Sequence, residues 1–354
     1  MMQTSRRTPR KFSAKRLSVR LLCLLAVIVL ALAVKNLFWS PLPRGAYPVL
    51  STARWAGRSS RAAGYPQHHW LPNGDLAYLE TNANGMPQVC YRKMDSTGPI
   101  GPARPGPELP LAANHGSFLP SPDEQWVASV SVAGNNRYKT VLVSADGRTT
   151  RTFGELLAIW LPDSRSFLAN SYSSQLALKI CHLDSSHTEA LAGMTVQDMP
   201  CPVTTLPTSS EFLIGGFVIH SPQLGQSQNY PSMSLRSLPA AHPGVSERTW
   251  TAHAPADMEF GIAYASPDDK HLLWVAVGTK PSPWVQWLRK IVPAWKTTAK
   301  VPTRYFLSDL RGSGMHPILN NLMGQTWNIS PVWTPDSRHL SFIYKEQLYL
   351  VAVE

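Results

Sequence analysis

Short apolar runs alternate with turn residues from about residue 65 onward, and one arrangement of them recurs. Each copy has an apolar or aromatic stretch, a proline beside a small polar residue, a short turn, and a run rich in β-branched and aromatic residues, as strands are. The prolines of the copies are Pro72, Pro122, Pro162, Pro207, Pro267 and Pro335. Further apolar runs follow most copies, so the pattern predicts units of four strands at the period of propeller blades.

The residue after each proline has the chemistry of a tight turn. Proline sets φ for the first corner, and an Asp or Asn beside it can hydrogen-bond its own backbone. Aspartates at this position are expected to be structural rather than catalytic: Asp123, Asp163, Asp268 and Asp336. Three copies also carry an aromatic two residues before the proline: Trp70, Trp160 and Trp333.

The combination W-x-P-D followed by an apolar run resembles the PD40 repeat of TolB-like six-bladed propellers, over about residues 65–354. The resemblance implies an all-β fold of six four-stranded blades, and envelope functions that act through protein contacts. The copies at Pro72 and Pro207 lack the Pro-Asp pair. Because the sequence stops after the third strand of the last unit, we expect residues 46–55 to supply its outer strand and remove an exposed edge.

The first 46 residues predict a membrane anchor. Residues 1–20 carry seven Lys or Arg and no acid, which is +7 of the formal +11. Residues 21–39 are apolar except for Lys35 and Asn36 and are long enough to cross a bilayer. The positive-inside rule then leaves the tail in the cytoplasm and exports the rest. Residues 40–46 are expected to be a linker and residues 47–354 the propeller. Cleavage after the small residues of Ala31-Leu32-Ala33 is the alternative.

The fifth unit is long because of an insert over residues 280–301. Its apolar residues have the spacing of one face of a helix, and basic residues flank them. Such a helix suits contact with a membrane surface or a partner, or local packing on the propeller. The residues that would make the contact are Trp284, Trp287, Leu288, Ile291 and Trp295.

No catalytic, cofactor or metal motif occurs in the sequence. It contains no CxxC, HExxH or GxSxG, and with +4 spread over 334 residues no nucleic-acid partner is expected. Cys181 and Cys201 could form a disulfide in an exported protein or stay buried thiols. If the protein were an enzyme, its site would lie in the central channel, where five polar residues are candidates: His68, His69, Asp257, Glu259 and Asn328.

The sequence thus supports two hypotheses of different class. The first is a non-enzymatic scaffold at the outer face of the cytoplasmic membrane that binds an envelope protein or a ligand, without a cofactor. The second is a propeller enzyme of the lactonase, lyase or glycosidase type. Acidic or histidine residues converging in the channel would favour the enzyme, and a channel lined by apolar and hydroxyl residues would weaken that hypothesis.

Overall fold

The computed structural model of the chain describes residues 42–56, 68–95, 97–110, 117–133, 137–171, 177–185, 188–190, 198–206, 211–218, 232–239, 248–278, 303–319, 331–344 and 346–353. Residues 43–354 form one compact unit. The predicted tail and anchor lie outside the described residues. Within the ranges given above, no helix is long and apolar enough to cross a membrane.

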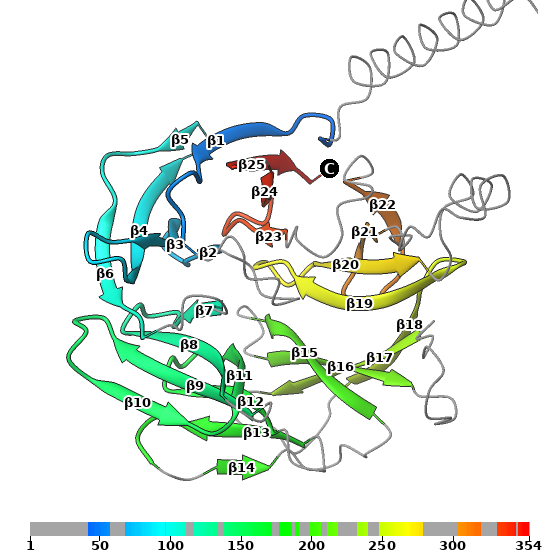
Figure 1. Cartoon of the computed structure of the whole chain (residues 1–354). Coiled ribbons are helices and arrows are strands. Elements are labelled where there is room, and N and C mark those ends of the chain that lie inside the picture. Colours follow the sequence, from blue (N-terminus) through cyan, green and yellow to red (C-terminus); the bar gives the residue numbers. More distant parts are fainter. Residues whose placement is uncertain are drawn as a thin grey trace, which may run out of the picture. The chain divides into compact units, whose positions relative to one another are not determined.

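The described strands form six sheets that follow one another around a common centre (Figure 1). Neighbouring strands in every sheet are antiparallel. The sheet that comes first in the sequence contains β2 (His68–Trp70), β3 (Asp75–Thr81), β4 (Pro87–Asp95), β5 (Gly98–Pro99) and β6 (Arg104–Glu108). The next contains β7 (Ser117–Pro120), β8 (Trp126–Ala133), β9 (Arg137–Ser144) and β10 (Thr150–Phe153).

The next three sheets have the same meander order, whereas the last sheet takes one strand from the start of the described chain. One contains β11 (Leu156–Trp160), β12 (Ser166–Ser171), β13 (Ala177–His182) and β14 (Thr188–Ala190). The next contains β15 (Asp198–Leu206), β16 (Glu211–Val218), β17 (Ser232–Pro239) and β18 (Arg248–His253). It is followed by β19 (Met258–Ala265), β20 (His271–Gly278), β21 (Thr303–Asp309) and β22 (His316–Ile318). The last contains β23 (Val332–Trp333), β24 (His339–Tyr344), β25 (Gln347–Ala352) and β1 (Tyr47–Ser51).

The all-β propeller is confirmed, but the prediction of six four-stranded blades holds for only five of the sheets. In the sheet that begins with β2, the short strands β5 and β6 both pair with β4, so this sheet has five strands. The segment over residues 98–108 contains four prolines, which lack the N–H that a continuous outer strand needs. The outer position is therefore split into two short pieces.

The ring is closed by the N-terminal strand, as expected. β1 pairs antiparallel with β25, with Tyr47 opposite Leu350 and Ser51 opposite Gln347. A backbone hydrogen bond from Thr52 N to Glu346 O extends this pairing by one residue. The last sheet thus gains its outer strand from residues nearly 300 positions away in the chain. This sheet therefore cannot unfold without separating β1 from β25.

The core lies between neighbouring sheets. Leu71, Leu79, Tyr91, Phe118 and Val143 pack together from the first two sheets, and equivalent clusters fill other junctions between sheets. Because middle strands are covered on both faces, β20 reads HLLWVAVG as a nearly continuous apolar run instead of alternating.

Candidate functional site

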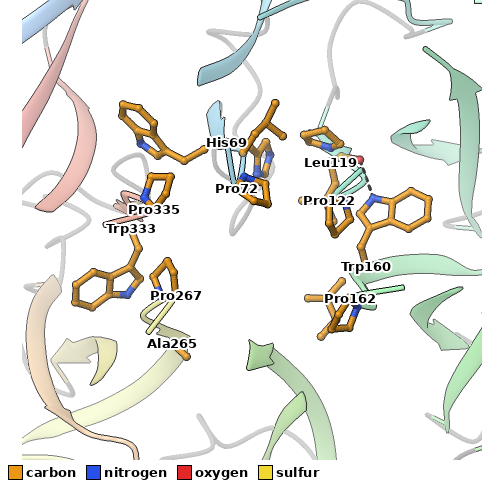
Figure 2. Close-up of a pocket in the computed structure, with 14 residues that line it drawn as sticks. His69, Pro72, Leu119, Pro122, Trp160, Pro162, Ala265, Pro267, Trp333 and Pro335 are labelled. Atoms are coloured by element: carbon orange, nitrogen blue, oxygen red, sulfur yellow. Dashed lines mark hydrogen bonds between the residues drawn. The ribbon is translucent and has the colours of Figure 1, made fainter. Parts of the chain in front are cut away.

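Proline rings from five of the six sequence repeats surround one cavity of about 550 Å³. The proline rings belong to Pro72, Pro122, Pro162, Pro267 and Pro335. Figure 2 shows His69 and Pro72 on one part of the wall, Trp160 and Pro162 on another, and Trp333 with Pro267 on a third. Each proline follows an inner strand, so the cavity lies at the centre of the ring. The repeat itself builds this site.

The repeated turns that carry these prolines are held by their own side chains. In four copies the carboxylate Oδ1 accepts the backbone N–H two residues further on, and Asn73 Oδ1 does the same for Asp75 N at 2.8 Å. Glu124, Ser164, Asp269 and Ser337 then adopt left-handed φ of 56–59°, where the first copy has Gly74. These bonds place each aspartate carboxylate within its own turn, and a structural rather than catalytic role for the aspartates stays a prediction.

Hydrogen bonds also shift the ionisation of two of these aspartates. Partial burial opposes ionisation of Asp268, but hydrogen bonds from Ser266 and Lys270 outweigh it and lower the pKa of this carboxyl. Burial likewise opposes ionisation of Asp336, and bonds from Thr334 and Arg338 outweigh it and lower its pKa. Both carboxylates are therefore ionised at neutral pH.

Neighbouring turns are linked to each other around the ring. Asn73 Nδ2 donates to Glu124 Oε1 at 2.6 Å, from the first sheet to the second. The backbone N–H of Asp123 donates to Ser164 Oγ at 3.0 Å, and that of Asp268 donates to Ser337 Oγ at 2.9 Å. In each case the residue after the proline is joined to the left-handed residue of the next turn. We call these five turns, residues 72–75, 122–125, 162–165, 267–270 and 335–338, the collar.

The three repeat tryptophans join their own inner strands to the preceding sheets. Trp160 Nε1 donates to Leu119 O at 3.0 Å, and Trp333 Nε1 donates to Tyr264 O at 3.2 Å. Both carbonyls stand three residues before the proline of the preceding copy. The indoles are therefore fixed in position as part of the cavity wall (Figure 2).

Trp70 reaches the equivalent carbonyl through a serine. Its Nε1 donates to Ser341 Oγ at 2.8 Å, and Ser341 Oγ donates to Val332 O at 3.0 Å. His68 Nε2 lies 2.7 Å from the same hydroxyl. Because the single hydroxyl proton goes to Val332 O, His68 must donate from Nε2. This junction joins the first sheet to the sheet that closes the ring.

The two adjacent histidines are neutral at physiological pH. Burial lowers the pKa of His68 to about 3, with a further lowering by a charge on His69. Burial also lowers the pKa of His69 to about 4, against a smaller raising effect of the Phe118 backbone. His69 is 9% exposed and lines the cavity, and its Nε2 has no hydrogen-bond partner within the described part of the chain. The ring packs edge-on to Phe118, with centroids 4.9 Å apart.

The polar residues expected in the channel have different surroundings in the described structure. His69 lines the cavity, whereas His68 is buried in the junction behind it. Asp257 is exposed in the turn before β19, and Glu259 follows it on that strand, where partial burial raises the pKa of its carboxyl. Asn328 lies outside the described residues. In the described ranges, no three His, Cys, Asp or Glu side chains are placed to hold a metal ion.

The contact residues predicted in the insert, Trp284, Trp287, Leu288, Ile291 and Trp295, also lie outside the described residues. Cys181 is a buried free thiol, and burial raises its pKa to about 12, so it is protonated at neutral pH. The side chain of Cys201 is not among those described. The repeat pattern predicted that its prolines and tryptophans build the fold, but it did not show that they share one cavity wall.

Comparisons with known proteins bear on the fold. No protein-family model matches the chain, so membership of the PD40 family is not confirmed, and no curated protein matches it. Among solved structures, it is similar to a protein described as a TolB of Agrobacterium tumefaciens, with 12% identity over 82% of this chain and 91% of that one and a TM-score of 0.49.

Two further solved structures show the range of functions among such neighbours. The chain is similar to TolB from Acinetobacter baumannii, with 10% identity over 87% of this chain and 63% of that one and a TM-score of 0.43. It is also similar to an oligogalacturonate lyase in complex with manganese, with 10% identity over 81% of this chain and 76% of that one and a TM-score of 0.47. The structural neighbours thus include both TolB proteins and an enzyme.

Proposed function

We propose that this chain is a six-bladed propeller that is anchored in the cytoplasmic membrane by residues 21–39 and acts outside it as a binding scaffold. The cavity at the centre of the collar is its binding site, and an envelope protein is its partner. The proposal rests on one observation above all. The described wall is built from proline, tryptophan and aliphatic side chains with a single, neutral histidine.

The chemistry of this wall supports binding rather than bond cleavage. Ligand cavities of a few hundred Å³ with mainly apolar walls gain affinity from removing apolar surface from water. The collar hydrogen bonds and the indole bonds hold the wall in place before a ligand arrives. Binding therefore costs less conformational entropy than it would at a mobile surface.

The charge distribution supports the anchored location. Seven basic residues precede the apolar run, and β1 begins only eight residues after Trp39. A membrane segment so close to the propeller would keep the scaffold at the bilayer surface.

The test is site-specific photocrosslinking in cells with the full-length chain. A benzoylphenylalanine replaces Ile159, in the cavity wall, or Asn84, an exposed turn residue. Asn84 follows the end of β3, whereas the cavity lies near the beginning of that strand. Membranes are washed with carbonate before the crosslinked partner is identified by mass spectrometry.

We expect the chain to resist the wash and to crosslink one envelope protein from Ile159 but not from Asn84. Release of a shortened chain by the wash would refute the anchor. The crosslinking result, not the wash, decides whether the cavity is the binding site. Equal crosslinking from both positions, or none from Ile159, would refute the cavity as the binding site.

A further inference from the structure

The cavity and its surroundings differ sharply in charge. The described part of the wall carries no formal charge, because His69 is the only titratable side chain among these lining residues and burial keeps it neutral. The five turns of the collar contain seven acids and three bases, a net charge of −4 in a chain whose formal net charge is +11. An uncharged apolar cavity is thus bordered by an acidic rim.

Some of the rim acids are already neutralised within the chain, and others are not. Arg104 lies 2.9 Å from Glu124 and 3.8 Å from Asp75, and Lys270 lies 3.3 Å from Asp268. Asp123 and Asp163 are exposed and form no ion pair with any residue that the structure describes. Their Oδ1 atoms accept backbone N–H groups, which leaves Oδ2 of each carboxylate for a ligand.

These two carboxylates flank one sector of the cavity wall. Asp123 directly follows Pro122 and Asp163 directly follows Pro162, and both prolines line the cavity beside Trp160 (Figure 2). A flat aromatic group packs well on proline and indole rings. The same sector therefore offers an apolar seat and two available negative charges.

A second observation in the wall points to an occupant. His69 Nε2 is buried and has no hydrogen-bond partner among the residues that the structure describes. Buried polar atoms are nearly always paired, so a bound group that donates a hydrogen bond to this nitrogen would satisfy it.

We infer that the cavity takes an aromatic side chain of a cationic peptide segment, whose flanking Lys or Arg side chains pair with Asp123 and Asp163. This inference rests on the proposed binding function and names the chemistry of its partner. The overall charge of the chain would repel such a segment, so the acidic collar is what selects this face of the molecule.

The test uses the full-length chain in nanodiscs of zwitterionic phosphatidylcholine, which do not attract cationic peptides by charge. Binding of three fluorescein-labelled peptides, KKWKK, EEWEE and KKAKK, is measured by anisotropy, with empty nanodiscs as blank. The Asp123→Asn/Asp163→Asn variant removes both charges. Asn73 shows that an asparagine can make the same turn, so this variant should fold. Asp95→Asn/Asp146→Asn, two exposed acids in turns outside the collar, is the matched control.

We expect KKWKK to bind, and EEWEE and KKAKK to bind much more weakly. The collar variant should weaken KKWKK binding by about two- to thirtyfold, the range for two exposed ion pairs, and added salt should reduce the difference. The control variant should bind like the original protein. Equal binding of EEWEE, or an unchanged affinity of the collar variant, would overturn the inference.

A blocking variant separates this inference from the proposed function. Ile159→Trp places an indole in the cavity and should abolish KKWKK binding. If KKWKK does not bind at all while Ile159 still crosslinks an envelope protein in cells, the cationic aromatic ligand is wrong and the scaffold function stands. If both fail, the cavity is not a binding site.

Discussion

Replacing Ser341 by alanine removes one oxygen from the junction that closes the ring. That hydroxyl is fully buried and takes part in three hydrogen bonds, to His68 at 2.7 Å, Trp70 at 2.8 Å and Val332 O at 3.0 Å. At two other junctions an indole bonds the carbonyl of the preceding sheet directly. Here the serine carries that bond, so its loss disconnects Trp70 from the last sheet.

The magnitude follows from the groups that are left behind. Truncation leaves the Nε2 of His68, the indole N–H of Trp70 and one carbonyl without their partner. A buried polar group left unsatisfied costs about 1–3 kcal/mol. The indole is only partly buried and can recover a bond to water, so we expect a loss of about 2–5 kcal/mol in the free energy of unfolding.

Ser144→Ala is the matched control. Ser144 Oγ also makes two hydrogen bonds, to Asp146 and from the backbone of Thr149, but in an exposed turn where water can replace them. We expect this control to lose less than about 1 kcal/mol.

The assay is urea unfolding of the full-length chain in detergent, followed by tryptophan fluorescence. An equal m-value in the two variants allows their midpoints to be compared as stabilities. If Ser341→Ala is no less stable than Ser144→Ala, the hydroxyl does not hold the ring closed and the reasoning is wrong.

Two other predictions concern the buried histidine pair and a closely packed glycine. The folded pKa values of about 3 and 4 for His68 and His69 lie below the unfolded value of 6.5. At a pH between the folded and unfolded values, the unfolded chain binds more protons than the folded chain. The free energy of unfolding therefore falls as the pH falls below 6.5. Between pH 7.5 and 5 each histidine should cost about 2 kcal/mol, measured by urea unfolding, and His69→Leu should remove about half of this dependence. Gly312→Ala should cost roughly 2–4 kcal/mol in the same assay, because its Cβ would lie 2.7 Å from that of Ala252 at φ +77°. Gly147→Ala has a similar φ and open space, so it should show only the backbone cost of about 1–2 kcal/mol.

The sequence predicted the fold well where the repeat is regular. Proline followed by aspartate specifies a local turn, and the local turn fixes where β8, β12, β20 and β24 begin. The closing strand was predictable too, because a missing outer strand leaves an edge that some other segment must cover. The first sheet was predicted less well, since prolines over residues 98–108 split its outer strand. In that segment, the prolines prevented the continuous outer strand that the repeat predicted.

The cavity was less predictable because it depends on distances between repeats. Nothing in one copy shows that its proline ring will face the prolines of four others, and the hydrogen bond from Trp160 to Leu119 joins residues 41 positions apart. His69 illustrates the same limit. The sequence placed it in the channel, but its neutral state and its unpaired Nε2 come from burial that only the assembled ring creates.

The repeat therefore has two physical roles. Its side-chain caps hold each turn, and the links between turns join three neighbouring turns of the collar in one group and two in another. Connected turns resist displacement by a ligand, so a peptide bound at the cavity meets a wall that is already formed. Residues such as Asp123 and Asp163 can then vary in charge at little structural cost, because Asn73 makes the same turn without a carboxylate. At the positions that follow the prolines, a substitution can thus change which partner is bound without changing the stability of the turn.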